Sequence, residues 1–217
     1  MILVGVYLVL AALFFGGWYW FSLRYTRRKA VRVLRWIEAA LVNQGHATGM
    51  HWLDSSRFKV PLRLNSGVFH CAWMIVQLSP CETPMNWILG KLLGRQDVII
   101  FQADLDWAPM FSLDVHNFRW FARSSRKSSP ADSRWTFEQT GPFVITTRMD
   151  WQKEIVSAMT SLAGMTGKEF LNISFSHHSP HFSVTMPLGT IAPANPTRTW
   201  MFEAVREVAT SALPSLY

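Results

Sequence analysis

The sequence predicts an α+β protein with one N-terminal transmembrane helix, followed by a mainly antiparallel sheet domain with helices on one face. Three observations carry this prediction. Residues 2–21 have no charged side chain, and the rest of the chain consists largely of short strand-like segments separated by turn residues. A Pro-x-Phe-Ser motif also occurs twice, at 109–112 and at 180–183, which suggests a repeated unit. Hairpin strands with helices gathered on one face are typical of the α+β class.

The first element is the apolar segment 2–21, ILVGVYLVLAALFFGGWYWF. At about 1.5 Å per residue, such a helix spans a hydrocarbon core of roughly 30 Å. Trp18, Tyr19 and Trp20 at its end form a predicted membrane-interface belt. A cleaved signal sequence is the alternative, but it would have basic residues before its apolar core and small residues at a cleavage site. The sequence therefore predicts a retained anchor over 1–23.

The distribution of positive charge predicts an orientation. Arg24, Arg27, Arg28 and Lys29 follow the apolar segment, and no basic side chain precedes it. Basic residues stay on the cytoplasmic side of a membrane. We therefore expect a single-pass protein of the cell membrane, with its N-terminus outside and its C-terminal domain in the cytoplasm. Cys71 and Cys81 agree, because they fit neither a disulfide framework nor a C-x-x-C pair.

Residues 24–45 predict a basic amphipathic helix, separated from the anchor by a few residues. Its apolar side is marked by Ala30, Val31, Leu34, Ile37 and Leu41. The basic side is either a solvated face or a contact with anionic lipid, and its closeness to the bilayer favours lipid. The predicted lipid or anionic-partner contacts are Arg24, Arg27, Arg28, Lys29, Arg32 and Arg35.

Residues 46–121 predict a first ββαββ unit. Residues 57–64 alternate apolar and basic side chains, and Pro61 indicates an edge strand or a bulge. A buried strand over 69–78 follows. A helix then begins at Thr83-Pro84, runs to about Leu93 and ends at Gly94. Two further strands, 97–105 and 110–121, should form a hairpin.

Residues 133–217 predict a second unit with the same order of elements. Two strands, at about 133–139 and 143–149, precede a helix over 150–162. A hairpin follows around Ser179-Pro180, and a helix over about 198–211 closes the chain. The polar, Ser-rich segment 122–132 should be a mobile linker. The sequence leaves open whether the two units share one sheet or form two lobes.

The candidate chemistry is weak. His177, His178 and His181 could bind zinc or copper, but a closed site needs four ligands, and neighbouring strand residues point to opposite faces. Exposed turn histidines are therefore the prediction. Asp104 and Asp106 resemble the D-x-D pair of nucleotide-sugar transferases, yet such enzymes need a nucleotide-binding βαβ arrangement. Nucleotide-binding, zinc-protease and serine-hydrolase motifs are absent from the sequence, so no catalytic residue or cofactor is predicted.

Composition directs the functional hypothesis to the membrane. The formal net charge is +7 and there are eleven tryptophans. A basic protein favours anionic partners, and tryptophan is favoured at membrane and protein interfaces. The leading hypothesis is a non-enzymatic scaffold or accessory subunit of a membrane complex, bound to lipid and to a membrane protein or a second copy of itself. The tether makes nucleic acid a poorer candidate. The alternative is a membrane-tethered enzyme with a dispersed site, such as a metal-dependent transferase or hydrolase.

Overall fold

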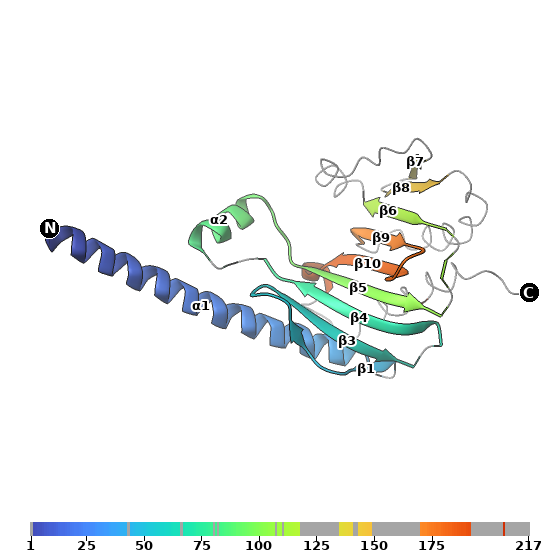
Figure 1. The fold of residues 1–217 in the computed structure, drawn as a ribbon, viewed down its shortest axis with the longest axis horizontal. Helices are drawn as coiled ribbons and strands as arrows, with labels where there is room; N and C mark the ends of the chain where they lie inside the picture. The colour runs from blue at the N-terminus through green and yellow to red at the C-terminus, as the bar shows by residue number, and fades with distance from the viewer. Residues whose placement is uncertain are drawn as a thin grey trace, which may run out of the picture.

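The computed structural model describes residues 2–42, 44–65, 67–79, 81, 83–106, 108–109, 111–117, 135–140, 143–148, 170–191 and 206. It shows an α+β fold, with a long apolar N-terminal helix followed by one antiparallel sheet (Figure 1). The predicted linker at 122–132 and the predicted helix at 150–162 lie outside the described residues. So does the helix predicted at 198–211, apart from Arg206, which is helical.

The anchor and the basic helix form a single helix, α1 (Ile2–Ala40), of 39 residues. The predicted connection between them is wrong. Residues 22–29, SLRYTRRK, contain neither proline nor glycine, so nothing in that segment ends a helix. The N-terminal half of α1 projects beyond the sheet, and its C-terminal half lies against it (Figure 1).

The sheet has ten strands, of which two are short edge strands, β1 (Gly45–Ala47) and β2 (His51–Trp52). The other eight are β3 (Arg57–Leu64), β4 (Phe69–Gln77), β5 (Val98–Leu105), β6 (Leu113–Asn117), β7 (Trp135–Thr140), β8 (Phe143–Arg148), β9 (Asn172–Phe175) and β10 (Phe182–Pro187). Their order is β1-β3-β4-β5-β10-β9-β6-β8-β7, with β2 paired to β3. The two predicted units therefore share one sheet.

The predicted hairpin between the strands at 97–105 and 110–121 is wrong. β5 pairs with β4 and β10, whereas β6 pairs with β8 and β9. The β9–β10 hairpin, which was predicted, lies between them. The second Pro-x-Phe-Ser motif thus starts the return strand of a hairpin and the first does not. In each segment the first two strands pair with each other, as β3 with β4 and β7 with β8, but the last two strands pair with each other only in the second segment.

Pro61 sits where β3 changes partner rather than on a free edge. β1 pairs with Leu62 to Leu64 of β3, and β2 pairs with Phe58 and Lys59. Pro61 falls between these ladders, and its carbonyl accepts a hydrogen bond of 3.0 Å from the amide of Thr48. The missing N–H of proline is therefore placed where no ladder needs it. The prediction that β3 is an edge strand is wrong. The missing N–H of proline nevertheless explains why the pairing on this side of β3 is interrupted at Pro61.

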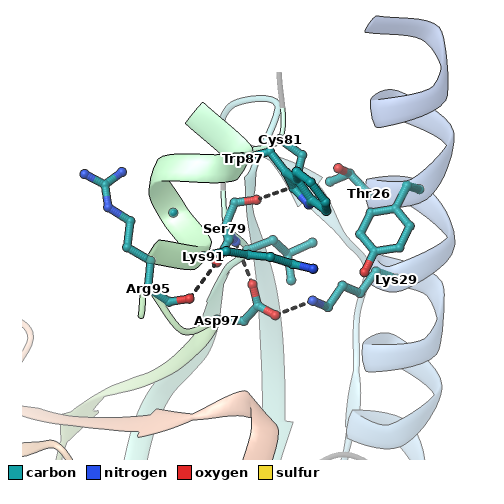
Figure 2. Close-up of a pocket in the computed structure, with 11 residues that line it drawn as sticks. Thr26, Lys29, Ser79, Cys81, Trp87, Lys91, Arg95 and Asp97 are labelled. Carbon is teal, nitrogen blue, oxygen red and sulfur yellow. Dashed lines mark hydrogen bonds and ion pairs between the residues drawn. The ribbon is translucent and has the colours of Figure 1, made fainter. Parts of the chain in front are cut away.

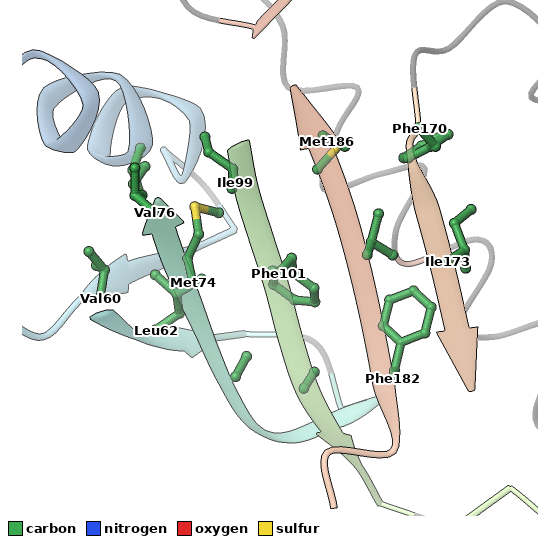
Figure 3. Close-up of a cluster of buried hydrophobic side chains, with 14 of the residues drawn as sticks. Val60, Leu62, Met74, Val76, Ile99, Phe101, Phe170, Ile173, Phe182 and Met186 are labelled. Carbon is green, nitrogen blue, oxygen red and sulfur yellow. The ribbon is translucent and has the colours of Figure 1, made fainter. Parts of the chain in front are cut away.

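The apolar face of the sheet forms the core together with the C-terminal half of α1. Fully buried side chains of neighbouring strands meet there, among them Met74, Phe101 and Phe182 (Figure 3). From α1 the core receives Ala30, Val33, Ile37 and Ala40, and Leu41, which follows the helix, joins them. Val31, predicted to face the core, is exposed, and Val33 takes that place. The same face holds Phe111, which is buried as predicted.

The opposite face of the central strands is mainly polar, with Ile75 and Ile100 as apolar exceptions on β4 and β5. Ser183, Ser174 and Asp114 stand in one row across β10, β9 and β6. The same row on β4 and β5 holds Trp73, whose indole N–H donates to Gln102 Oε1 at 2.7 Å. The Lys59 ammonium lies 4.3 Å above the Trp73 ring. Period-two alternation therefore separates an apolar layer from a polar one, as the strand patterns predicted.

One helix does not cover the sheet. α2 (Pro84–Leu92) begins as predicted, with the Thr83 hydroxyl accepting from the Asn86 amide at 3.2 Å and Pro84 in the first turn. It ends at Gly94, whose φ of 59° favours glycine. It stands off the end of the sheet, beside the projecting half of α1 (Figure 1). The expectation that the helices gather on one face is therefore wrong for α2. A short helix, α5 (Leu188–Ile191), follows β10.

Candidate functional site

One concave feature of the described residues is the α1–α2 cleft, with a volume of about 180 Å³. It lies where α1, α2 and the ends of β4 and β5 meet (Figure 2). Its wall is formed by Tyr25, Thr26, Lys29, Leu78, Ser79, Cys81, Trp87, Gly90, Lys91, Arg95 and Asp97. The cleft therefore lies beside the segment of α1 where the apolar sequence gives way to the basic one.

Tryptophan fixes α2 to α1 at the end of the apolar segment. The Trp18 indole N–H donates to the Cys81 carbonyl at 3.1 Å. The Trp18 and Trp87 rings meet edge to face, with centroids 5.9 Å apart. Aromatic pairs of this geometry stabilise a contact beyond the area that they bury. α2 is thus held at the level of residue 18 of α1.

An ion pair closes the other end of the cleft. Lys29 Nζ of α1 pairs with Asp97 Oδ2, just before β5. Asp97 Oδ1 accepts a hydrogen bond of 2.6 Å from the Ser79 amide, which follows β4. One carboxylate therefore ties α1 to two neighbouring strands. Lys29 was predicted to contact lipid, but its charge is committed to Asp97.

The remaining cations of the cleft belong to the C-terminal end of α2. The Lys91 ammonium lies 4.4 Å above the Trp87 ring, and Arg95 follows the helix. In Figure 2, Trp87 lies toward the N-terminal end of α1, while Lys91 lies at the level of Lys29. The cleft is thus aromatic at one end and cationic at the other.

The cysteine of the cleft is not suited to nucleophilic chemistry. Burial raises the pKa of the Cys81 thiol above its ordinary value of 9.0, and Asp97 raises it further, while Lys29 opposes both. The thiol donates to the Ser79 carbonyl at 3.2 Å. A thiol rather than a thiolate is present at neutral pH, and the thiolate is the reactive form.

The side chains of the predicted aromatic belt point to two different sides of α1. Trp18 turns inward to α2, whereas Tyr19 and Trp20 are exposed. The Arg24 guanidinium lies 4.1 Å above the Trp20 ring on the outer surface. The predicted basic residues other than Lys29 are exposed: Arg24, Arg27, Arg28, Arg32 and Arg35.

The three candidate metal ligands lie at the tip of the β9–β10 hairpin and do not converge. His177 Nδ1 donates to the Pro109 carbonyl at 3.0 Å, and His178 is exposed. His181 Nδ1 lies 3.9 Å from Asp104 Oδ1, and neither atom has a hydrogen-bond partner among the described residues. Among the residues that the structure describes, no group of three or more His, Cys, Asp or Glu side chains could hold a metal ion.

Among the described members of the predicted chemistry, Asp104 approaches His181, and the rings of His177 and His178 meet with centroids 5.8 Å apart. Asp104 and His181 are the pair that joins an acidic group to an imidazole. They lie at the far end of β5 from Asp97, and β5 spans eight residues. At about 3.3 Å per residue, more than 20 Å separates this pair from the α1–α2 cleft. Sequence reasoning missed the cleft because its wall comes from four separate segments. The Trp18 belt and the Thr83-Pro84 cap were its only sequence signals.

Comparison with known solved structures gives a limited likeness. The sequence matches no protein-family model and no curated protein. Among solved structures, the chain is similar to the mycobacterial trehalose monomycolate transport factor A, TtfA, with 11% identity and a TM-score of 0.43. The likeness covers 83% of this chain and 94% of that one. At these values it carries no argument about function.

Proposed function

We propose that this chain is a single-pass, membrane-anchored accessory or scaffold subunit of a membrane protein complex. One observation carries the proposal. Residues 4–21 of α1 are apolar and almost all exposed, and the same helix is built into the domain from Ser22 onward. Ser22 and Thr26 are buried, four residues apart on one face of the helix, and Thr26 lines the cleft.

The length of the projecting segment fits a bilayer. Twenty residues, 2–21, make a helix of about 30 Å, which equals the hydrocarbon thickness. One helix of the described chain is long and apolar enough to cross a membrane by length and composition. A signal sequence would satisfy the same test. Its removal, however, would take away Trp18, whose indole joins α1 to Cys81 and Trp87.

The positive residues give the proposed orientation. Arg24, Arg27 and Arg28 follow the span at once and are exposed. Because basic residues favour the cytoplasmic side, we propose that the N-terminus lies outside and the domain in the cytoplasm. The lipid contact is narrower than the sequence predicted. Because α1 continues without a break, Arg32 and Arg35 lie about 21 and 26 Å along the axis from Trp18. If the helix axis lies near the membrane normal, Arg32 and Arg35 are beyond the headgroup layer, and their distance from it exceeds the screening length of about 8 Å.

Purification of the intact chain from its native membrane tests the proposal. After chemical cross-linking and extraction in mild detergent, we expect one or more integral membrane proteins to co-purify in fixed proportion. A matched variant, Leu13→Arg, places a charge in the middle of the span and should reduce membrane insertion and abolish co-purification together. A chain that purifies alone, or that is released from membranes by alkaline carbonate, would contradict the proposal.

A further inference from the structure

We infer that α2 is a second membrane-contacting element, immersed in the interfacial layer of the bilayer beside the span and covered by lipid. The inference rests on the proposed function, because the span sets the position of the membrane. It adds to that function a surface of contact that does not cross the bilayer.

The composition of α2 does not suit water. Its sequence, PMNWILGKL, has one charged residue, and Gly90 is its one buried residue. The exposed apolar side chains of the helix and its end are Met85, Trp87, Ile88, Leu89, Leu92 and Leu93, of which Leu92 is 77% exposed. A helix that is apolar on all sides is normally buried in a core or in a membrane. A nine-residue helix also gains its stability from packing rather than from intrinsic propensity.

The contacts of α2 set its depth. Trp87 packs on Trp18, which ends the apolar part of α1, so α2 lies level with the aromatic belt. Its apolar N-terminal residues lie toward the span, and Lys91 lies toward the domain (Figure 2). Apolar side chains would then enter the acyl boundary, with Lys91 and Arg95 among the headgroup phosphates. This is the arrangement of interfacial helices, which bury one side to about 5–10 Å.

Charge agrees with a lipid occupant. Lys91 and Arg95 have one acidic neighbour among the residues that line the cleft, Asp97, and that carboxylate is paired with Lys29. On α1, two exposed residues adjacent in sequence to the cleft residues Tyr25 and Lys29 are also basic, Arg24 and Arg28. Cations surrounding an apolar helix beside a span match an anionic membrane surface.

Fluorescence quenching of the full-length chain in nanodiscs tests this inference. The nanodiscs hold one copy each, in phosphatidylcholine with a minority of phosphatidylglycerol. A polarity-sensitive fluorophore is attached to a single cysteine, Leu92→Cys, with the native Cys71 and Cys81 replaced by serine. We expect a blue-shifted emission and a loss of fluorescence when the lipids carry a nitroxide near the top of the acyl chain.

Two further labels make the result decisive. Cys71 is exposed and lies at the far end of β4, so its label should keep a water-like emission and resist lipid quenching. A label at Phe14→Cys, in the middle of the span, should be quenched by a nitroxide deep in the acyl chain. Quenching of the Phe14 label together with a water-like emission from the Leu92 label would contradict the inference about α2 and leave the proposed anchor intact. An unquenched Phe14 label would overturn the proposed anchor.

The same nanodiscs distinguish lipid from protein as the cover of α2. If the emission of the Leu92 label is blue-shifted only when two copies share a nanodisc, a second copy covers the helix and the inference is wrong. The double substitution Leu92→Asp with Ile88→Asp should remove α2 from the bilayer while α1 stays inserted. The Phe14 label would then remain quenched, and a label at Leu93→Cys would show a water-like emission. That outcome supports lipid contact by α2 itself.

Discussion

At the scale of single residues, Phe182 is a central packing group of the sheet. Its side chain is fully buried, and its ring contacts those of Phe175, Phe101 and Phe69, with centroids 4.9, 6.3 and 6.5 Å away. These rings come from three other strands, so Phe182 joins the first and second halves of the chain. Loss of the Phe182 ring would leave a cavity beside the rings of Phe175, Phe101 and Phe69.

Phe182→Ala should lower the free energy of unfolding by about 3–5 kcal/mol. Truncation of a fully buried aromatic ring loses both its transfer free energy and the contacts that surround it. Chemical denaturation of the detergent-solubilised chain, followed by tryptophan fluorescence, measures the change. Ser183→Ala is the matched control, because Ser183 lies half-buried on the polar face and should change stability by about 0.5 kcal/mol or less. Equal effects of the two substitutions would contradict the assigned faces.

A titrating pair on the polar face makes stability depend on pH. Burial raises the pKa of Asp114 above 3.8, and His116 partly offsets this. Burial lowers the pKa of His116 below 6.5, and Asp114 partly offsets that. Between 3.8 and the raised pKa of Asp114, the folded state binds more protons than the unfolded state. Ionisation of Asp114 therefore lowers the free energy of unfolding as pH rises through this window.

Asp114→Asn should remove this cost. The variant should be more stable than the parent at neutral pH, where the parent carboxylate is ionised and partly buried. The gain should disappear below pH 3.8, where Asp114 is protonated in both states. Urea denaturation of parent and variant at the two pH values measures the difference. A gain that is equal at both would show that ionisation of Asp114 does not destabilise the fold.

At the scale of elements, α1 combines two functions that the sequence separated. Its first half is exposed and apolar, and its second half buries Val33 and Ile37 in the core. The length of the uncharged apolar run identified the first half and helical periodicity identified the second, but neither gave information about the residues between them. Residues 22–29 contain no proline or glycine that would end a helix. This absence indicates a continuous helix only when the segments on both sides are known to be helical.

The continuity of α1 predicts that its arginines are not equivalent. Arg24, Arg27 and Arg28 changed together to Gln should reduce the phosphatidylglycerol that remains bound to the chain after mild detergent extraction, as native mass spectrometry measures. Each charge near an anionic surface is worth about 1 kcal/mol, so the set is worth about 3 kcal/mol. Arg32→Gln with Arg35→Gln is the control on the same helix and should leave bound lipid unchanged. Equal losses from both sets would mean that α1 lies along the membrane rather than across it.

The strand pairing marks the limit of prediction from this sequence. Alternation located β3, because side-chain period two is a local property, and short apolar segments located β4, β8 and β10. It did not reveal that β9 and β10 separate β5 from β6, since pairing between distant strands depends on contacts across the whole sheet. The α1–α2 cleft was missed for the same reason. Trp18 was interpreted as a belt residue, but its hydrogen bond to Cys81 spans 63 positions of sequence.

At the scale of the whole molecule, the proposed orientation can be tested with the chain's own cysteine. Cys71 is exposed at the end of β4 that is remote from α2. In a Cys81→Ser background, a membrane-impermeant thiol reagent added to intact cells should leave Cys71 unlabelled, and permeabilisation should expose it. A cysteine introduced before Ile2 should show the reverse behaviour. Labelling of Cys71 from outside would reverse the proposed orientation.

The unbroken passage of α1 from the apolar segment into the core has a mechanical consequence. A flexible linker would let the domain search a volume above the membrane, whereas a continuous helix gives it almost no reach. The domain would instead move with the span, by lateral diffusion and by rotation about the helix axis, at a fixed height. Any partner would have to present its surface at that height, within the breadth of one domain. A four-residue Gly-Ser insertion after Phe21 would release this constraint while leaving both the span and the core intact.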